Sequence, residues 1–167
     1  MAGRNSLAID QEIEERTLVL SRVFDAPRAL VYKVWTQPEH LARWWGPRGF
    51  TLLSYKADVR VGGSYRFGTR SPEGTEHWAH GVYREVAPPE RLVLTHAWEH
   101  PDGKPKHETI MTLTFAEQGD KTKLTLKQTL FESVTSRDLH HGGWSSTLDM
   151  LGEYLARHGG VAGSDHP

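Results

Sequence analysis

The clearest hydrophobic pattern lies near the C-terminal end of the chain. Apolar residues recur there at intervals of three and four, which places them on one face of an α-helix; they are Trp144, Leu148, Leu151 and Leu155. We expect this helix over residues 135–157, with the glycines at 159 and 160 ending it. A helix of that length spans about 33 Å and needs a broad apolar surface to cover.

The preceding part of the chain changes to an alternation of apolar and polar residues, which is typical of β-strands with one buried face. Strands are predicted at 17–24, 50–56, around Tyr65 and Phe67, and at 77–86, 91–98, 107–115 and 121–130. Two short helices are predicted between residues 25 and 46, after the first strand. Because short turns join the later strands, we expect an α+β fold in which one antiparallel sheet of about six or seven strands wraps around the long C-terminal helix.

The length of the chain, 167 residues, is that of one domain. We expect residues 1–16 to form a flexible arm, residues 17–158 the folded domain and residues 159–167 a flexible tail. The first 16 residues are polar and do not resemble a secretory signal. No apolar stretch reaches the roughly 20 residues of a membrane-spanning helix. The sequence therefore predicts a cytoplasmic protein.

The charge of the chain argues against some classes of partner. The formal net charge is -1, and lysine and arginine form no block, so we expect neither nucleic-acid binding nor membrane insertion. The absence of cysteine excludes disulfides and thiol chemistry. No glycine-rich phosphate-binding loop is present, and we expect no cofactor.

Ten histidines raise the question of a metal site, but their spacing argues against one. His77 and His80 lie three residues apart on a predicted strand, so their side chains point to opposite faces. His96 and His100 share a face but lie about 13 Å apart along an extended strand. We therefore expect no metal site.

Several motifs along the chain resemble those of one known family. They are RVFDAP at 22–27, WTQPEHLARWWGP at 35–47, VGGSYRF at 61–67, GVYREV at 81–86, PERL at 89–92, and Gly143-Trp144 with Leu148 and Leu151. In these motifs the chain resembles the activator of heat-shock protein 90 ATPase homologues, within the START-like superfamily of polyketide cyclases and lipid-transfer proteins. The resemblance extends over residues 17–158 and implies a helix-grip fold.

The resemblance also implies an elongated pocket between the sheet and the C-terminal helix that holds hydrophobic or aromatic molecules. Our main hypothesis is therefore the binding of a small hydrophobic or aromatic molecule in this cavity. Gly81 makes the alternation in the strand at 77–86 ambiguous, because a strand glycine often marks a bulge. The expected walls are Tyr65, Phe67, Trp78, His80, Leu94, His96, Trp98, Met111, Leu113, Trp144 and Leu148. The sequence leaves open whether the cavity is empty or filled by its own aromatic side chains.

One alternative is a cyclase- or hydrolase-type enzyme that uses the same cavity. His80 and His96 are the candidate catalytic residues, as acid or base. The competing interpretation of each is a hydrogen-bonded interior histidine without a catalytic role.

Another alternative is a protein-interaction module, either a co-chaperone relative or a homodimer, with an exposed apolar patch around Trp45. Adjacent helical residues face different directions, so we expect one of Trp44 and Trp45 in the core and the other at a pocket rim or partner surface. The co-chaperone that gives the family its name carries a separate N-terminal chaperone-binding domain. Only 16 residues precede the first predicted strand here, so we expect no activation of a chaperone ATPase.

Overall fold

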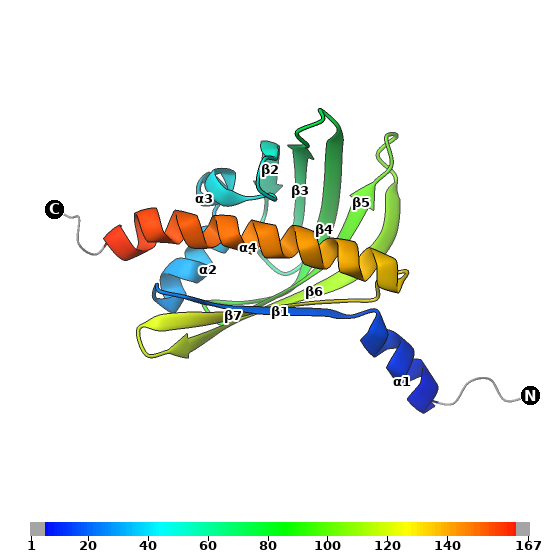
Figure 1. The fold of residues 1–167 in the computed structure, drawn as a ribbon, viewed down its shortest axis with the longest axis horizontal. Helices are drawn as coiled ribbons and strands as arrows, with labels where there is room; N and C mark the ends of the chain where they lie inside the picture. The colour runs from blue at the N-terminus through cyan, green and yellow to red at the C-terminus, as the bar shows by residue number, and fades with distance from the viewer. Residues whose placement is uncertain (1–5, 163–167) are drawn as a thin grey trace, which may run out of the picture.

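Seven strands in the described part of the chain, residues 6–162, form one curved antiparallel sheet in this computed structural model (Figure 1). The strand order across the sheet is β1-β7-β6-β5-β4-β3-β2, so the first strand pairs with the last. The strands are β1 (Leu18–Phe24), β2 (Thr51–Ala57), β3 (Ser64–Arg70), β4 (Glu76–Ala87), β5 (Arg91–Glu99), β6 (Pro105–Gln118) and β7 (Lys121–Thr129). The α+β architecture predicted from the alternation is confirmed.

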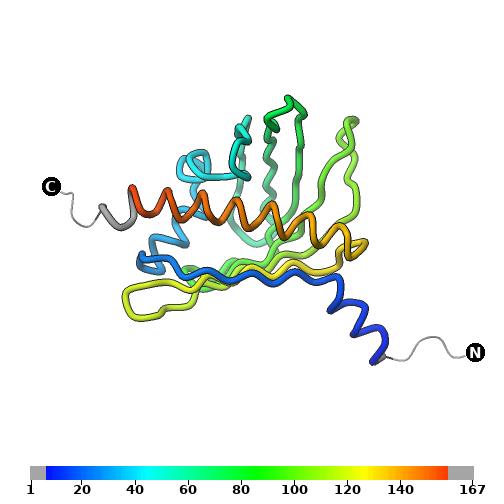
Figure 2. The backbone as a smooth tube through the Cα atoms, viewed as in Figure 1, coloured from blue at the N-terminus to red at the C-terminus, as the bar shows by residue number. Residues whose placement is uncertain are grey.

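The long helix α4 (Val134–Ala162) lies across one face of this sheet (Figures 1 and 2). Its apolar stripe is buried as predicted, and Leu148 and Leu151 are fully inaccessible to solvent. Arg22 interrupts the apolar face of β1 because it reaches the helix. Its guanidinium donates to Asp149 Oδ1 at 2.6 Å and to the carbonyl of Ser145 at 3.2 Å. These bonds fix the helix on the first strand.

Both ends of α4 differ from the expectation. The helix begins at Val134, where Ser133 Oγ accepts a hydrogen bond from the backbone N–H of Ser136 at 3.0 Å and so caps the first turn. It continues through Gly159 and Gly160 to Ala162, so the predicted end at these glycines was wrong. The rest of the expected tail, residues 163–167, lies outside the described residues.

The two short helices predicted after the first strand are present as α2 (Arg28–Thr36) and α3 (Pro38–Trp44). They pack against the sheet and against α4 through a cluster of tryptophan rings. Trp44 Nε1 donates to the carbonyl of Val34 at 3.0 Å, and Trp45 packs edge-on against Trp35 and Trp144. Both Trp44 and Trp45 are buried, so the predicted exposed patch around Trp45 was wrong.

The N-terminal arm is helical where the structure describes it. Helix α1 (Ser6–Glu15) projects away from the sheet at the end opposite the C-terminus (Figures 1 and 2). The sequence analysis predicted no helix in this segment, and residues 1–5 lie outside the described part. The division of the chain into arm, domain and tail stays a prediction.

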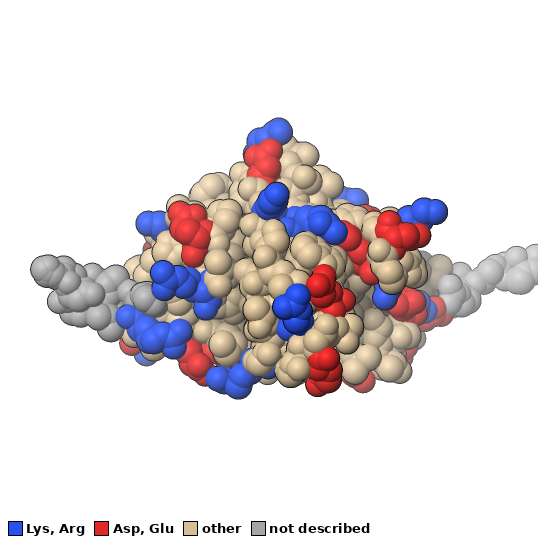
Figure 3. All heavy atoms as spheres, turned by 90° about the horizontal axis from the view of Figure 1, so that it is seen from above, with Lys and Arg blue, Asp and Glu red and all other residues tan. Residues whose placement is uncertain are grey.

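Charged side chains of both signs are interspersed on the face drawn in Figure 3, and neither sign gathers into a large patch there. This agrees with the formal net charge of -1. Within residues 6–162, none of the helices combines the length and the apolar character needed to cross a membrane.

Candidate functional site

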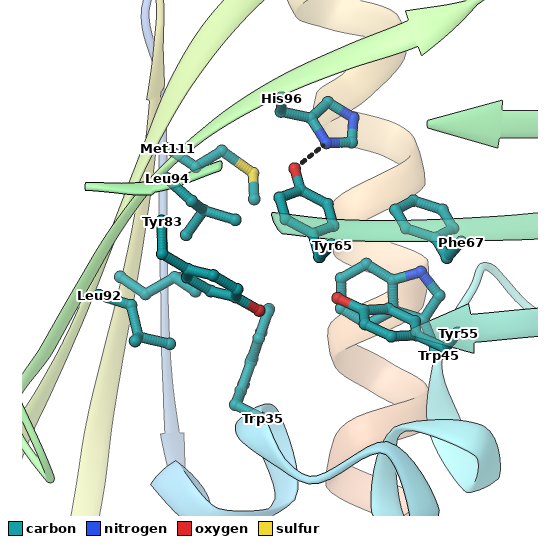
Figure 4. A pocket seen from close by; sticks show the side chains of 11 residues that line it. Trp35, Trp45, Tyr55, Tyr65, Phe67, Tyr83, Leu92, Leu94, His96 and Met111 are labelled. Atoms are coloured by element: carbon teal, nitrogen blue, oxygen red, sulfur yellow. Dashed lines mark hydrogen bonds between the residues drawn. The ribbon is translucent and has the colours of Figure 1, made fainter. Parts of the chain in front are cut away.

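Two spaces lie on the inner face of the sheet: an inner hollow between the sheet and the segment with α2 and α3, and an outer pocket between the sheet and α4. The inner hollow has a volume of only about 10 Å³, which is about the space that one water molecule needs. Rings and aliphatic side chains fill the rest of it, as Figure 4 shows. Its walls are Trp35, Trp45, Tyr55, Tyr65, Phe67, Tyr83, Leu92, Leu94, His96, Met111 and Leu113. The inner half of the predicted cavity is therefore closed by its own aromatic residues.

The outer pocket is open and has a volume of about 620 Å³. It lies where the first half of α4 passes over the ends of β3, β4 and β5. Its walls are Trp45, Gly46, Pro47, Phe50, Phe67, Thr69, His77, His96, Trp98, Lys106, Glu132, Leu139, His140, Gly143, Trp144 and Thr147. Most of this surface is apolar, and half of the sixteen wall residues carry an aromatic ring when histidines are counted. Such a lining is typical of sites for small, mostly apolar molecules.

Most of the residues predicted as cavity walls do line one of these two spaces. Phe67, His96, Trp98 and Trp144 line the outer pocket, and Tyr65, Leu94, Met111 and Leu113 line the inner hollow together with Phe67 and His96. Leu148 lines neither, because it is fully buried in the core beneath α4.

Trp78 and His80 were wrongly predicted, because they project from the opposite face of the sheet. The inward residues of β4 are Ala79, Gly81 and Tyr83 instead. On the outer face, Trp78 stacks beneath the guanidinium of Arg66, 4.2 Å from the ring centroid. The alternation along β4 therefore has the opposite phase to the predicted one.

The packing of Tyr65 against β4 explains why position 81 is a glycine. A Cβ atom at this position would lie 1.9 Å from the carbonyl oxygen of Thr95 and 2.6 Å from the ring of Tyr65. The ring of Tyr65 passes directly over the glycine to reach Thr95 on β5. The close approach of ring and strand therefore requires a residue without a side chain.

His80 belongs to a charged network on the outer face. Its Nδ1 lies 2.8 Å from Glu99 Oε2, and Arg66 binds the same carboxylate through two nitrogens at 2.9 Å each. The hydrogen bonds from Arg66 lower the pKa of Glu99 more than those from His80 do. His80 is thus a structural partner of Glu99 and has no access to the pocket.

His96 occupies the boundary between the two spaces. Its ring is 3% exposed, and burial lowers the pKa of His96 from 6.5 to about 3, so the ring is neutral at physiological pH. Its Nδ1 lies 2.9 Å from the hydroxyl of Tyr65 (Figure 4). Burial likewise raises the pKa of Tyr65 well above its usual range.

A chain of buried polar groups connects α4 to the strands beside His96. Trp144 Nε1 donates to Gln128 Oε1 at 2.8 Å, and Gln128 Nε2 donates to Thr109 Oγ1 at 2.8 Å. The hydroxyl of Thr109 in turn donates to the carbonyl of His96 at 3.1 Å. Each donor has an acceptor, so the chain fixes the indole of Trp144 in the pocket wall without leaving a polar group unpaired.

A second bond joins β5 to α4 at the pocket wall. Trp98 Nε1 donates to His140 Nε2 at 2.9 Å, while His140 Nδ1 donates to the carbonyl of Ser136 at 2.7 Å. Nε2 accepts the bond from Trp98 and therefore carries no proton, whereas Nδ1 donates its proton to Ser136. The ring of His140 is therefore neutral, with its proton on Nδ1. Burial lowers the pKa of His140, which favours this neutral form.

Several wall residues were missed by sequence reasoning. Thr69, His77, His140 and Thr147 supply polar groups to the outer pocket. His140 lies four residues before Trp144 and Thr147 lies three residues after it, which places all three on one face of the helix. The helical spacing around Trp144 could therefore have identified them as wall residues. Within residues 6–162, no three histidine, aspartate or glutamate side chains come close enough together to hold a metal ion.

Comparison with solved structures identifies the same fold in bacterial proteins. A protein from Nitrosomonas europaea is 26% identical, with a TM-score of 0.73 over 86% of this chain and 96% of that one. A protein from Chromobacterium violaceum is 28% identical, with a TM-score of 0.73 over 83% of this chain and 95% of that one. The AHSA1 protein of Silicibacter pomeroyi is 23% identical, with a TM-score of 0.78 over 85% of this chain and 99% of that one. These neighbours share the START-like fold.

The family model gives a more specific result. No curated protein matches the sequence. Residues 25–156 match the model of the Activator of Hsp90 ATPase homolog 1-like proteins, from the end of β1 to the second half of α4. This chain therefore belongs to the Activator of Hsp90 ATPase homolog 1-like family.

Proposed function

We propose that this protein binds a small hydrophobic or aromatic molecule in its outer pocket. The observation that carries the proposal is an open space of about 620 Å³ with a mainly apolar wall rich in aromatic rings, within a domain whose inner core is otherwise filled. Ligand pockets commonly have volumes of about 300–1,000 Å³ and apolar linings with a few polar groups. Burial of an apolar molecule there would be driven by the hydrophobic effect and by ring stacking.

The site favours binding over acid–base catalysis. His80 lies on the other face of the sheet, which leaves His96 as the remaining candidate of the two. A group with a pKa of about 3 is a weak base at neutral pH, and an efficient general base needs a pKa near the working pH. The hydroxyl of Tyr65 does not activate His96 either, since it is bonded to the carbonyl of Thr95.

The proposal is tested by filling the pocket from the helix. Gly143 lines the outer pocket and nothing lies within 4 Å of a Cβ placed on it, so Gly143→Leu should fold and should occupy part of the ligand space. We expect the affinity for the neutral probe N-phenyl-1-naphthylamine, measured by its fluorescence on titration, to fall by about tenfold or more.

Gly142→Leu is the matched control. Gly142 is adjacent on the same helix and equally free of neighbours, but it is exposed and lines neither space. It should leave the affinity for the probe within about twofold of the wild type. Equal affinities for wild type and both variants, or no binding of the probe to the wild type, would contradict the proposal.

The remaining expectations, about partners and location, stay predictions. They are a homodimer, no activation of a chaperone ATPase, no nucleic-acid partner and a cytoplasmic location.

A further inference from the structure

One nitrogen of His96 has no hydrogen-bond partner within the described residues. The ring is 3% exposed and lines the outer pocket, and Nδ1 is its only atom bonded to another side chain. Figure 4 shows the second nitrogen, Nε2, on the ring edge that points away from Tyr65 and Met111. Nε2 is not among the fully buried side-chain atoms that lack a partner in the described residues, so it is accessible from the open pocket that His96 lines. It therefore identifies a position where a polar group of a ligand could bond.

The hydrogen bonds around Tyr65 determine whether Nε2 carries a proton. The hydroxyl oxygen of Tyr65 lies 2.7 Å from the carbonyl oxygen of Thr95. Two oxygens at this distance need a proton between them, and a carbonyl has none to give. The single hydroxyl proton of Tyr65 is therefore donated to Thr95.

An irregularity in the sheet makes this bond necessary. The N–H of Val82 donates to the side chain of Thr95, at 2.9 Å from Oγ1. The carbonyl of Thr95 points toward Gly81, where the ring of Tyr65 covers it. Tyr65 thus satisfies a buried backbone carbonyl, which fixes the direction of its hydroxyl.

The proton on His96 follows from this arrangement. Because Tyr65 has donated its only proton to Thr95, its oxygen must accept the bond from His96, and Nδ1 must be the protonated nitrogen. In a neutral imidazole the other nitrogen then carries a lone pair. Nε2 is a hydrogen-bond acceptor at the pocket wall.

The other groups of the pocket indicate a neutral ligand. Its charged side chains are Lys106 and Glu132, which have opposite signs and so give no net attraction for an ion. The ring of His96 packs against those of Phe67 and Trp98, with ring centroids 6.1 and 5.3 Å away, and these two rings also contact each other at 5.9 Å. A ligand group that reaches Nε2 is therefore surrounded by aromatic surface.

We propose that the outer pocket selects neutral aromatic or apolar molecules that carry a hydrogen-bond donor, such as a phenolic hydroxyl or a ring N–H, and that this donor bonds to His96 Nε2. The inference rests on the proposed binding function and specifies the class of ligand. A molecule that offers only a carbonyl, ether or carboxylate oxygen at this position could not form this hydrogen bond, because the lone pairs of its oxygen and the lone pair of Nε2 repel each other.

The test compares two probes with the same rings, one with a hydroxyl donor and one in which a methyl group replaces the hydroxyl proton. We expect 2-naphthol to bind about tenfold more tightly than 2-methoxynaphthalene in isothermal titration calorimetry, because the ether has the same rings but no proton to donate. In His96→Phe, which keeps a flat ring packed against Phe67 and Trp98, the ratio should fall to about one. Trp78→Phe, on the outer face of the sheet, should keep the wild-type ratio.

A measurement on the wild type covers the case in which His96→Phe does not fold. The ¹⁵N spectrum of the histidine side chains should show Nδ1 of His96 protonated and Nε2 unprotonated. Equal affinities for the two naphthalenes, or a proton on Nε2, would overturn this inference and leave the binding function standing. Failure of both naphthalenes and of N-phenyl-1-naphthylamine to bind would overturn the binding function together with it.

Discussion

Substitution of Gly81 by alanine (Gly81→Ala) is expected to lower the free energy of unfolding by about 4 kcal/mol or more, or to prevent folding. The added Cβ would lie 1.9 Å from the backbone oxygen of Thr95, a distance that no rotamer change relieves. The backbones of β4 and β5 must separate, and the ring of Tyr65 must also move from its place over the glycine, which breaks its bond to Thr95. Chemical denaturation followed by tryptophan fluorescence measures the effect.

The matched control is Gly68→Ala on the neighbouring strand. Its Cβ would also be crowded, at 2.4 Å from the ring of Trp78, but this contact is with a side chain on the outer face of the sheet and not with backbone. We expect a cost of roughly 1–3 kcal/mol for this overpacked side chain. If Gly81→Ala were as stable as Gly68→Ala, the close packing of Tyr65 over β4 would be wrong.

A second large effect is expected from His96 at acid pH. Its pKa in the folded protein is about 3, against an ordinary value of 6.5. Above pH 6.5 the imidazole is neutral in the folded and unfolded states, so it adds no pH dependence. Below 6.5 the unfolded chain takes up a proton that the folded protein excludes. Stability should therefore decrease by about 1.4 kcal/mol per pH unit from 6.5 down to about 3.

His96→Phe isolates this contribution from those of the other titrating groups. The carboxyl of Glu99, whose pKa is lowered by Arg66, and the imidazole of His140 also make the wild type less stable in acid, but both remain in the variant. The slope of unfolding free energy between pH 6 and 4 should be shallower in His96→Phe by about 1.4 kcal/mol per pH unit. Parallel curves for the two proteins would show that His96 is not buried in the neutral form.

The regular elements were predictable where one face of the element is uniformly apolar. On β6 the buried residues Met111, Leu113 and Phe115 alternate with half-buried or exposed ones, so the period of two gave the correct inward face. On α4 the spacing of Leu148, Leu151 and Leu155 gave the buried stripe in the same way. In both cases the sequence pattern and the tertiary contact agree.

The inward face of β4 was not predictable from its own sequence. Trp78 and Tyr83 have opposite parity, so one large aromatic residue had to face outward whichever phase was chosen. The choice is made by residues on other strands: Gly68 leaves room for the ring of Trp78, and Tyr65 requires a glycine at position 81. These pairings depend on the strand register, which becomes known only in the folded sheet.

The candidate pocket was predictable only in part for a similar reason. The sequence identified Phe67, His96, Trp98 and Trp144 as wall residues, and all four line the outer pocket. How much of the cavity stays open depends on how rings from different elements pack together, and composition does not determine this. Trp45, from the segment after α3, lies against Tyr55 and Phe67 and separates the inner hollow from the outer pocket.

Nuclear magnetic resonance of the tryptophan indoles tests the central claim most directly. The protein would be labelled with ¹⁵N-tryptophan, and its indole N–H signals assigned by single substitutions and followed on titration with N-phenyl-1-naphthylamine. The account predicts saturable shifts of Trp45, Trp98 and Trp144, which line the outer pocket, and no shift of Trp78 on the far face. Shifts confined to Trp78, or a bound probe that moves none of the three pocket indoles, would contradict a ligand site beneath α4.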